Sequence, residues 1–456
     1  MRGRTNIPPR MGGIVNGVTR EYKVVEADGI DIGDYVELVS GVGNATEELY
    51  TGSLYYQGFC YRNFQLSPDK FVTFTTEANE LCAYILKKVE GVISTTLAKV
   101  KMKMELFNSS NNISFDIIEL ATGKYLLAAS DYYKYIGLYM VEYADNAFIL
   151  TLLEQKEISS STTGYGTIDK IVAISPNIYY VNATNFSFLF SLSNGNTITL
   201  GAIDKTFTGR TIGIVNGYLI LSGGDYSNGY NMISILCNSE TLAFTIVNTT
   251  ICEPNNLILR STSTCIIGNK IVAIYSATVA FIVTVQSNGS FSFSNEQRLQ
   301  ASSNALFTRC YKLLDGTICI VLYTYSKNSS NVLTVYNPLI LFAKLNEITD
   351  SLIMGPSGAQ KLFDYSASIG TSGSIYVSDF AEDANGVYAF LTSWYYMGGS
   401  STATRSIRVT GFCFEVEQMS LVTLDTKMVK KYSTKINGIA KTAGAKGEKI
   451  EVYAPE

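Results

Sequence analysis

Hydrophobic and polar residues alternate in short runs along most of the chain. Clear examples are Phe71–Thr75, Phe188–Phe190, Ile271–Tyr275 and Ile318–Tyr323. Alternation with a period of two places side chains on opposite faces of an extended backbone, so these runs predict β-strands. Windows with the apolar spacing of a helix are almost absent, and Ser, Thr, Asn and Gly recur between the runs. The pattern therefore predicts an all-β fold with frequent turns.

A unit of strands recurs along the chain. Each unit opens with a two-residue turn signal before an apolar strand, then passes a polar loop to a second strand and a tight turn to a third. Successive openings are 46 to 54 residues apart, except for a last interval of 70 residues, and a four-stranded propeller blade has about 40 to 50 residues. The openings are Asp69-Lys70, Gly123-Lys124, Asp169-Lys170, Asn216-Gly217, Asn269-Lys270, Asp315-Gly316 and Asn385-Gly386.

The hairpins inside two units support this interpretation. In the third unit, Asn194-Gly195-Asn196 separates two strand-like runs, and in the fifth Ser287-Asn288-Gly289 does the same. Asn-Gly is a strong hairpin signal because both central residues of a type I′ turn need positive φ. We predict a seven-bladed β-propeller over residues 51–425. A six-bladed ring is the first alternative, because the 70-residue interval leaves the count open, and tandem β-sandwiches or a β-helix are the others.

The two ends of the chain do not fit the repeat. Residues 13–50 and 426–456 each contain two or three short strands with Gly turns, too few to close a core alone. Together they predict a small β-barrel-like anchor module into which the propeller is inserted; alternatively, they close the first and last blades. Residues 1–12 carry Arg2, Arg4 and Arg10 with two prolines, which predicts an extended arm that docks on a neighbouring subunit or stays disordered.

Composition excludes several function classes. The chain has no histidine, which rules out His-dependent nucleophile activation and His-ligated metals. Its charged fraction of 16% and net charge of −4 provide no basic field for nucleic acid. We expect no membrane insertion, because no apolar run approaches the length needed to span a bilayer, and synthesis in a cytosol, because no signal peptide is visible. The eight cysteines form no CxxC pair, so we expect neither a metal nor a cofactor.

Enzymatic chemistry based on carboxylates remains open. Glycoside hydrolysis needs two carboxylates that flank the bond, and no histidine. The acidic residues near expected loops form no recognisable pair, so we assign no catalytic residue and expect a protein that is not an enzyme. The alternative is a carbohydrate-active enzyme, a glycosidase or lyase, that acts on host surface glycan. The acidic residues considered are Asp131, Asp225, Asp364, Asp379, Glu382 and Asp383.

Aromatic residues indicate where a ligand would bind. Neighbouring aromatics in a strand point to opposite faces, so one of each pair should point outward. Flat side chains with one hydrogen-bonding tip suit sugar rings and protein interfaces alike. The alternative is that these tyrosines fill the space between blades. Our ligand-binding candidates are Trp394, Tyr395 and Tyr396, beside a glycine- and serine-rich loop, together with Tyr132 and Tyr133.

The terminal segments carry a resemblance. Gly33-Asp34-Tyr35-Val36 near the start, and Gly438-Ile439-Ala440 with Gly447–Val452 at the end, resemble small β modules of virion proteins in tailed bacteriophages and phage-tail-like particles. No propeller signature accompanies them. The resemblance implies a virion structural protein, of tail-fibre, baseplate or capsid-decoration type, that is made in the host cytoplasm. It would assign assembly or anchoring to Arg2, Arg4, Arg10, Gly33, Asp34, Tyr35, Gly438, Gly447, Ile450 and Val452.

The implied partners follow from the same resemblance. They are other virion proteins, further copies of the chain in the particle, and a host surface glycan bound by the displayed propeller.

A bacterial intracellular scaffold propeller without a link to phages is a third hypothesis, after the glycan-active enzyme.

Overall fold

The structure is a computed structural model of the 456-residue chain. It describes residues 18–24, 30–32, 35–38, 45–56, 62–67, 70–77, 79–89, 92–93, 98–107, 113–131, 135–157, 166–184, 186–193, 196–204, 209–223, 231–252, 264–275, 279–299, 305–313, 316–327, 333–347, 349–354, 360–361, 366–370, 375–377, 388–396, 405–414, 418–421, 438–445 and 448–454.

The chain divides into two compact units. The larger unit comprises residues 45–354 and 358–414, and the smaller unit comprises residues 1–44, 355–357 and 415–456. Within the described ranges both units contain strands and turns, and neither contains a helix. The prediction of an all-β fold is therefore confirmed.

The described strands of the larger unit form seven antiparallel sheets, numbered here from sheet 1 to sheet 7. Sheet 1 contains β4 (Arg62–Ser67), β5 (Lys70–Glu77), β6 (Glu80–Val89), β7 (Val92–Ile93) and β8 (Ala98–Lys103). Sheet 2 contains β9 (Ser114–Ala121), β10 (Lys124–Ser130), β11 (Tyr135–Ala144) and β12 (Ala147–Glu157). Sheet 3 contains β13 (Ile168–Ser175), β14 (Ile178–Ala183), β15 (Phe186–Leu192) and β16 (Ile198–Leu200).

The next three sheets continue in chain order, and the last one draws on both ends of the unit. Sheet 4 contains β17 (Gly209–Val215), β18 (Tyr218–Gly223), β19 (Asn231–Asn238) and β20 (Ala243–Ile251), and sheet 5 contains β21 (Thr264–Ile267), β22 (Lys270–Tyr275), β23 (Val279–Val285), β24 (Phe291–Phe293) and β25 (Gln297–Arg298). Sheet 6 contains β26 (Ala305–Lys312), β27 (Ile318–Lys327), β28 (Leu333–Asn346), β29 (Ser351–Met354), β30 (Gln360–Lys361) and β31 (Ser366–Gly370). Sheet 7 contains β3 (Ala45–Tyr56), β34 (Arg405–Phe414), β33 (Tyr388–Tyr396) and β32 (Ile375–Val377).

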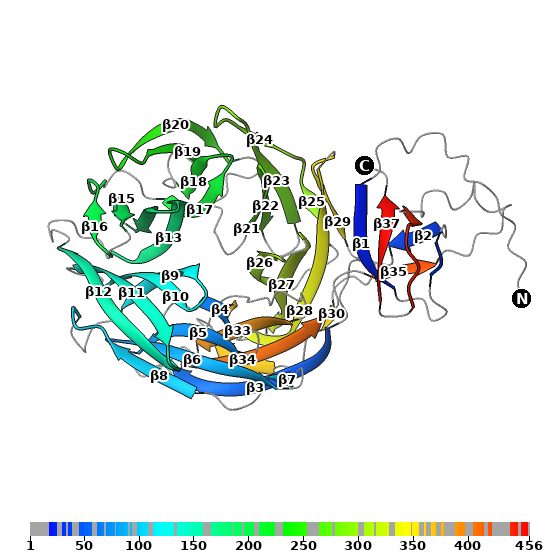
Figure 1. Ribbon diagram of the computed structural model, residues 1–456, viewed down its shortest axis with the longest axis horizontal. Coiled ribbons are helices and arrows are strands. Elements are labelled where there is room, and N and C mark those ends of the chain that lie inside the picture. The colour runs from blue at the N-terminus through cyan, green and yellow to red at the C-terminus, as the bar shows by residue number, and fades with distance from the viewer. Residues whose placement is uncertain are drawn as a thin grey trace, which may run out of the picture. The chain divides into compact units, whose positions relative to one another are not determined.

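Sheets 1 to 6 adjoin one another through their first strands, and sheet 6 adjoins sheet 7 through β32. Contacts join β4 to β9, β9 to β13, β13 to β17, β17 to β21, β21 to β26, and β26 to β32. These first strands lie on the inner side of the unit, and the sheets follow one another around a common centre (Figure 1). Radially stacked antiparallel sheets of this kind are the architecture of a β-propeller.

The apolar cores of the larger unit lie between neighbouring sheets. In β10, Tyr125, Leu127 and Ala129 belong to a cluster shared with sheet 1, while Leu126 and Ala128 belong to one shared with sheet 3. Both faces of this strand are therefore buried, as every one of these five residues has 0% exposure. A strand buried on both faces gains stability from apolar residues at every position, so its sequence is a continuous apolar run.

Sheet 7 joins the two ends of the larger unit. Its outermost strand, β3, comes from the beginning of the unit and pairs antiparallel with β34 from the end, from Ala45 opposite Phe414 to Tyr56 opposite Arg405. The remaining strands β33 and β32 continue the sheet inward. The ladder between β3 and β34 thus ties the start of the repeat to its end by backbone hydrogen bonds.

The turn signals of the sequence mostly mark the hairpin between the first and second strands of a sheet. Asn216 and Gly217 connect β17 to β18 with φ values of 51° and 82°, the positive values of a type I′ turn. The predicted unit therefore starts one strand late. Asp169-Lys170 is a wrong prediction, because both residues lie inside β13 and the turn follows at Pro176-Asn177. The Asp169 side chain is used between sheets, as described below.

The smaller unit is a closed barrel of short strands. Its order is β1 (Val18–Val24), β35 (Gln418–Leu421), β2 (Tyr35–Leu38), β36 (Gly438–Ala440) and β37 (Lys449–Ala454), and β37 returns to pair with β1. A backbone bridge between Ile30 and Gly444 adds a further link. Ile30, Ala440, Ile450 and Val452 are at most 2% exposed and form its described core. Both ends of the chain thus contribute strands to one small barrel.

The limits of the units differ from the predicted ones. The predicted propeller began at residue 51 and ended at residue 425, whereas β3 of sheet 7 begins at Ala45 and β35 (Gln418–Leu421) pairs within the barrel. The boundary between the two units is defined here by the pairing partners of the strands on either side of it. The predicted arm over residues 1–12 lies outside the described residues.

Candidate functional site

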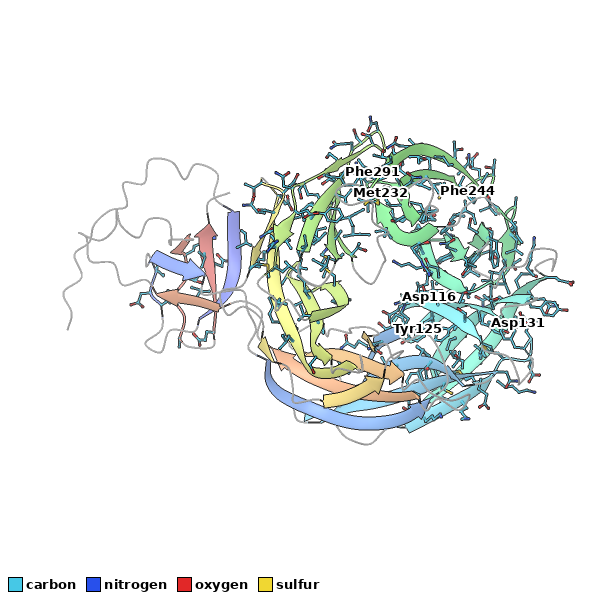
Figure 2. All side chains as sticks on the ribbon, turned by 180° about the vertical axis from the view of Figure 1, so that it is seen from behind. Asp116, Tyr125, Asp131, Met232, Phe244 and Phe291 are labelled. Atoms are coloured by element: carbon cyan, nitrogen blue, oxygen red, sulfur yellow. The ribbon has the colours of Figure 1, made fainter. Side chains whose placement is uncertain are left out.

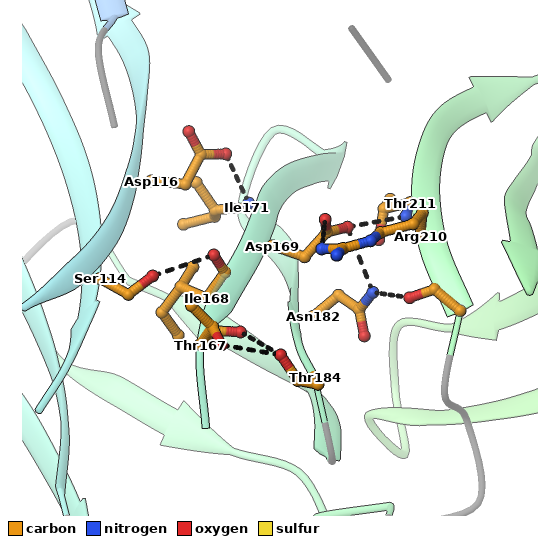
Figure 3. A network of polar contacts seen from close by, with 11 residues as sticks. Ser114, Asp116, Thr167, Ile168, Asp169, Ile171, Asn182, Thr184, Arg210 and Thr211 are labelled. Atoms are coloured by element: carbon orange, nitrogen blue, oxygen red, sulfur yellow. Dashed lines mark hydrogen bonds and ion pairs between the residues drawn. The ribbon is translucent and has the colours of Figure 1, made fainter. Parts of the chain in front are cut away.

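A network of polar side chains lies where the inner strands β9, β13 and β17 adjoin (Figure 3). Its first centre is Asp116 on β9, whose side chain is 3% exposed. Asp116 Oδ1 accepts a hydrogen bond from Arg62 Nε on β4 at 2.7 Å, and Oδ2 accepts one from the backbone N–H of Ile171 on β13 at 2.9 Å. One carboxylate therefore connects sheets 1, 2 and 3.

The second centre is Asp169 on β13, which connects sheet 3 to sheet 4. Its Oδ2 accepts a hydrogen bond from the backbone N–H of Thr211 at 2.8 Å, and its Oδ1 accepts one from Arg210 Nη1 at 2.9 Å. Asn182 on β14 donates to the carbonyl oxygen of Gly209 at 2.7 Å. Asp116 and Asp169 thus make the same kind of contact, from a carboxylate on one inner strand to a backbone N–H on the next.

Local irregularities of the strands place these side chains. The register of β13 against β14 shifts between Ile168 and Lys170, and that of β17 against β18 shifts between Thr211 and Gly213. A β-bulge leaves the extra residue outside the regular ladder and redirects its side chain. The bulge in β13 contains Asp169, so its carboxylate and the N–H of Thr211 can meet between the sheets. Ser114 Oγ adds a bond to the carbonyl oxygen of Ile168 at 3.2 Å.

The geometry of the network suits a structural role better than acid–base catalysis. A catalytic carboxylate has to exchange a proton with a substrate within hydrogen-bond reach. Both oxygens of Asp116 and both oxygens of Asp169 already accept bonds from protein donors. Charge-assisted bonds to buried or half-buried donors are among the strongest that proteins form, so these contacts join adjacent sheets firmly.

Of the six acidic residues considered for a glycosidase, only Asp131 lies within the described structure. Asp131 is 6% exposed, and its Oδ1 accepts a hydrogen bond from the backbone N–H of Tyr135, the first residue of β11, at 3.0 Å. In Figure 2, Asp116 lies towards the inner side of the larger unit, whereas Phe244 of β20 lies at its outer rim. The other five candidates, Asp225, Asp364, Asp379, Glu382 and Asp383, lie outside the described residues.

Burial keeps several titratable groups of the sheets neutral. It raises the pKa of the Tyr125, Tyr139 and Tyr180 hydroxyls well above the usual value for tyrosine, and nearby Glu119 and Glu105 raise those of Tyr125 and Tyr139 further. Burial also raises the pKa of the Cys237 thiol to about 11. A thiol with that pKa is protonated near neutral pH and is therefore a poor nucleophile.

The predicted ligand residues are only partly within the described structure. Tyr132 and Tyr133 lie outside it. Trp394, Tyr395 and Tyr396 belong to strand β33, where Trp394 pairs with Tyr376 of β32 and with Ile407 of β34. The backbone of these three aromatics is therefore part of a sheet and not of a loop. The glycine- and serine-rich segment that follows them lies outside the described residues.

The adjacent tyrosines Tyr179 and Tyr180 differ from the expectation that one residue of each aromatic pair points outward. Tyr179 and Tyr180 on β14 are 4% and 0% exposed, so neither points outward. Each face of sheet 3 packs on a neighbouring sheet, with Tyr179 in the cluster shared with sheet 2 and Tyr180 in the cluster shared with sheet 4. The prediction of one outward tyrosine was wrong for this pair, because it assumed a sheet with one solvent-exposed face.

Four of the ten predicted anchor residues lie in described strands of the barrel. Tyr35 lies in β2 and Gly438 in β36, and Ile450 and Val452 of β37 are buried in the barrel core. The Ile450 and Val452 side chains therefore stabilise the barrel from inside. Arg2, Arg4, Arg10, Gly33, Asp34 and Gly447 lie outside the described residues.

Sequence reasoning missed the centres of the polar network. Asp116 stands between Phe115 and Ile117 in an apolar strand, and Asp169 follows Ile168 in another. A single carboxylate inside an apolar run must be paired or hydrogen-bonded when the strand is buried, which is the signal that would have found both residues. The donors could not have been found in this way, because they lie on other sheets.

The described residues contain neither a metal-binding cluster nor a membrane-spanning helix. No cluster of three or more Cys, Asp or Glu side chains there could hold a metal ion. That part of the chain also has no helix with the length and apolar character needed to cross a membrane.

Comparisons with known proteins yield distant similarities of structure only. The sequence matches no protein-family model, and it matches no curated protein. A solved structure of a candidate 6-phosphogluconolactonase from Bacteroides fragilis is 11% identical, with a TM-score of 0.44, and covers 83% of this chain and 99% of its own. A second from Bacteroides uniformis is 11% identical, with a TM-score of 0.42, and covers 72% and 95%.

A third similar structure is a WD40 domain. The WD40 domain of SCAP from fission yeast is 10% identical to this chain, with a TM-score of 0.36, and the match covers 83% of this chain and 98% of that domain. Similarities at this level carry no conclusion about activity, substrate or partner.

Proposed function

We propose that the chain is a structural and binding protein, without enzymatic activity, on the surface of a tailed phage or a phage-tail-like particle. In this proposal the seven sheets are the blades of one closed seven-bladed propeller, with sheet 7 as the closing blade. The barrel anchors the protein in the particle, and the propeller is displayed for attachment to the host surface or for stabilising the particle.

The observation that carries the proposal is the topology of the chain. The sequence enters the larger unit through β3 and leaves it through β34, and these two strands pair with each other. The segments before and after them form one barrel. A large repeat inserted into a small module that uses both chain ends is an arrangement suited to holding a binding domain at a fixed attachment point.

Two further observations support the proposal. The paired donors on Asp116 and Asp169 favour a framework over a catalytic carboxylate site. The proposed class of particle rests on the resemblance of Gly33–Val36, and of Gly438–Ala440 with Gly447–Val452, to virion β modules. In this chain β36 and β37 belong to the barrel.

The experiment is to purify particles from cells that carry the gene and to measure the protein by quantitative mass spectrometry. We expect several copies per particle, and we expect particles from a deletion strain to lose a surface feature in electron micrographs or to adsorb less to host cells. A protein that is abundant in the lysate and absent from purified particles would refute the proposal.

A separate assay distinguishes the alternative of a glycan-active enzyme. The purified protein is incubated with host cell-wall or capsule glycan, and both bound and released sugar are measured. Binding without released oligosaccharide is the expected result. Release of oligosaccharide that depends on protein concentration would replace the display proposal with an enzymatic one.

A further inference from the structure

The interface between sheets 3 and 4 lacks the apolar inner part that its neighbours have. In the clusters shared by sheets 1 and 2, sheets 2 and 3, and sheets 4 and 5, the inner strands contribute buried apolar side chains, among them Phe115, Ile171 and Ile212. Among the described residues, the cluster shared by sheets 3 and 4 has no buried apolar side chain from β13 or β17. These two strands contribute the polar side chains of Asp169 and Thr211 instead.

Four buried oxygen atoms at this interface have no hydrogen-bond partner in the protein. They are Asn182 Oδ1, Thr211 Oγ1, Ser187 Oγ and Tyr180 OH, and each of the four residues is 0% exposed. Such an atom loses its hydrogen bonds to solvent when the chain folds and gains none in exchange, so isolated cases are uncommon in native proteins. Four of them at one interface indicate a shared partner that is not a protein atom.

Strand register and hydrogen bonds bring these atoms together. Asn182 and Ser187 lie opposite each other on β14 and β15, and Tyr180 lies two residues from Asn182, on the same face of the sheet. Asn182 Nδ2 and the backbone N–H of Thr211 both donate to Asp169 Oδ2, at 3.4 Å and 2.8 Å (Figure 3). Burial raises the pKa of Tyr180 and the Ser187 hydroxyl lowers it, so these two hydroxyls are also close, although they are not hydrogen-bonded to each other.

We propose that the inner part of the interface between sheets 3 and 4 binds internal water, held by Asn182 Oδ1 and Thr211 Oγ1 and reaching the hydroxyls of Ser187 and Tyr180. The Asn182 oxygen can only accept a hydrogen bond, whereas the hydroxyl of Thr211 can also donate one. A water molecule between them can therefore donate to the first and accept from the second. Internal waters typically make about three hydrogen bonds to buried polar groups that the protein leaves unsatisfied.

Charge and burial favour water over an ion or a larger ligand. The Asp169 carboxylate already accepts hydrogen bonds from Arg210 and from the N–H of Thr211, and the four unpartnered oxygens are neutral. A buried cation without an added negative charge would be costly at this place. The complete burial of the four residues keeps out a ligand that enters from the surface. The inference does not depend on the function proposed above.

The direct test is a crystal structure of the full chain at a resolution that shows ordered water. We expect electron density within hydrogen-bond distance of both Asn182 Oδ1 and Thr211 Oγ1. An interface without such density, in a map that shows other internal waters, would overturn the proposal. An anomalous peak at the same place in crystals grown with rubidium chloride would also overturn it, because that peak would identify a cation site.

A second test uses the sign of a change in stability. Thr211→Val removes one partner of the water and leaves Asn182 Oδ1 less well satisfied, so the midpoint of urea unfolding should fall. The matched control is Thr75→Val on β5, where the hydroxyl is likewise buried without a partner but is not one of the four oxygens between sheets 3 and 4. Removing that hydroxyl removes only its cost of burial, so this midpoint should stay or rise.

The two variants distinguish a hydrated interface from a dry one. In a dry interface the Thr211 hydroxyl has the same unsatisfied state as that of Thr75, and its removal stabilises the fold. A Thr211→Val midpoint equal to or above that of the wild-type chain would therefore overturn the proposal, provided that circular dichroism shows a folded protein.

Discussion

At the scale of single residues, buried carboxylates connect neighbouring sheets. Asp116 lies 54 positions along the chain from its donor Arg62 and 55 positions from its donor Ile171. Each bond therefore joins segments that have no local reason to be adjacent. Because hydrogen bonds to a charged partner contribute more than neutral ones, and because an unpaired buried charge is costly, these residues should affect stability more than exposed ion pairs do.

Replacing Asp116 tests this role directly. Asp116→Asn removes the charge that faces Arg62 and weakens the bond from the Ile171 N–H, so we expect the free energy of unfolding to fall by about 2 kcal/mol. The measurement is urea unfolding followed by circular dichroism. The control is Glu142→Gln, which removes an ion pair to Lys124 at 2.9 Å whose side chains are both 40% exposed. The control should cost less than about 1 kcal/mol. Equal losses in the two variants would argue against a role of Asp116 between sheets.

At the scale of elements, the turns and short connections of one sheet pack closely on the next. Gly201 follows β16 and donates its N–H to the carbonyl oxygen of Leu189 on β15 at 2.8 Å. A Cβ atom at this position would lie 2.4 Å from the carbonyl oxygen of Leu242 and 2.9 Å from that of Leu189. Leu242 belongs to the turn between β19 and β20. Sheets 3 and 4 therefore approach each other here at a distance that only glycine permits.

The variant Gly201→Ala measures the importance of this close approach. Backbone atoms on both sides must move to admit the methyl group, and overpacking of this kind typically costs about 1 to 3 kcal/mol. We expect a decrease of that size in the free energy of unfolding, again measured in urea. Ala202→Ser, at the exposed next residue, serves as the control and should change little. A Gly201→Ala protein with wild-type stability would show that the connection can shift without cost.

At the scale of the whole molecule, the ladder between β3 and β34 joins the beginning of the larger unit to its end. Both strands lie at the limits of this unit, which runs from Ala45 to Phe414 apart from residues 355–357. The barrel strands lie outside those limits. The sheets of the larger unit have their own apolar cores, so the unit should fold without the barrel, provided that β3 is retained.

Two truncated chains test the role of β3. A chain of residues 45–414 retains all strands of the larger unit, and we expect it to keep the circular dichroism of a β protein and to unfold cooperatively in urea. A chain of residues 62–414 lacks only β3 from that unit, so β34 loses its outer partner and the closing sheet loses its link to the start of the repeat. We expect a lower urea midpoint and a broader transition. If both chains unfold alike, closure by β3 contributes no stability.

The sequence predicted more of the fold than of the site. Period-two runs identified most strands, and Asn216-Gly217 and Ser287–Gly289 identified hairpins, because strand periodicity and turn conformation are local properties of the backbone. Asp169-Lys170 was misread as a turn, because two adjacent polar residues in an apolar stretch look the same in the sequence whether they form a turn or lie in a bulged strand. Only its donors on sheet 4 distinguish the bulged strand from a turn.

The sequence by itself determined that this protein is built of β-strands joined by short turns and that histidine chemistry plays no part in it. The tertiary structure alone decided that Tyr179 and Tyr180 are both buried, that Asp116 and Asp169 join sheets, and that β3 is the outer strand of sheet 7. The physical reason is the range of the interactions. Alternation and turn propensity act over a few residues, whereas burial on two faces and bonds between sheets depend on strands that lie far apart in the chain.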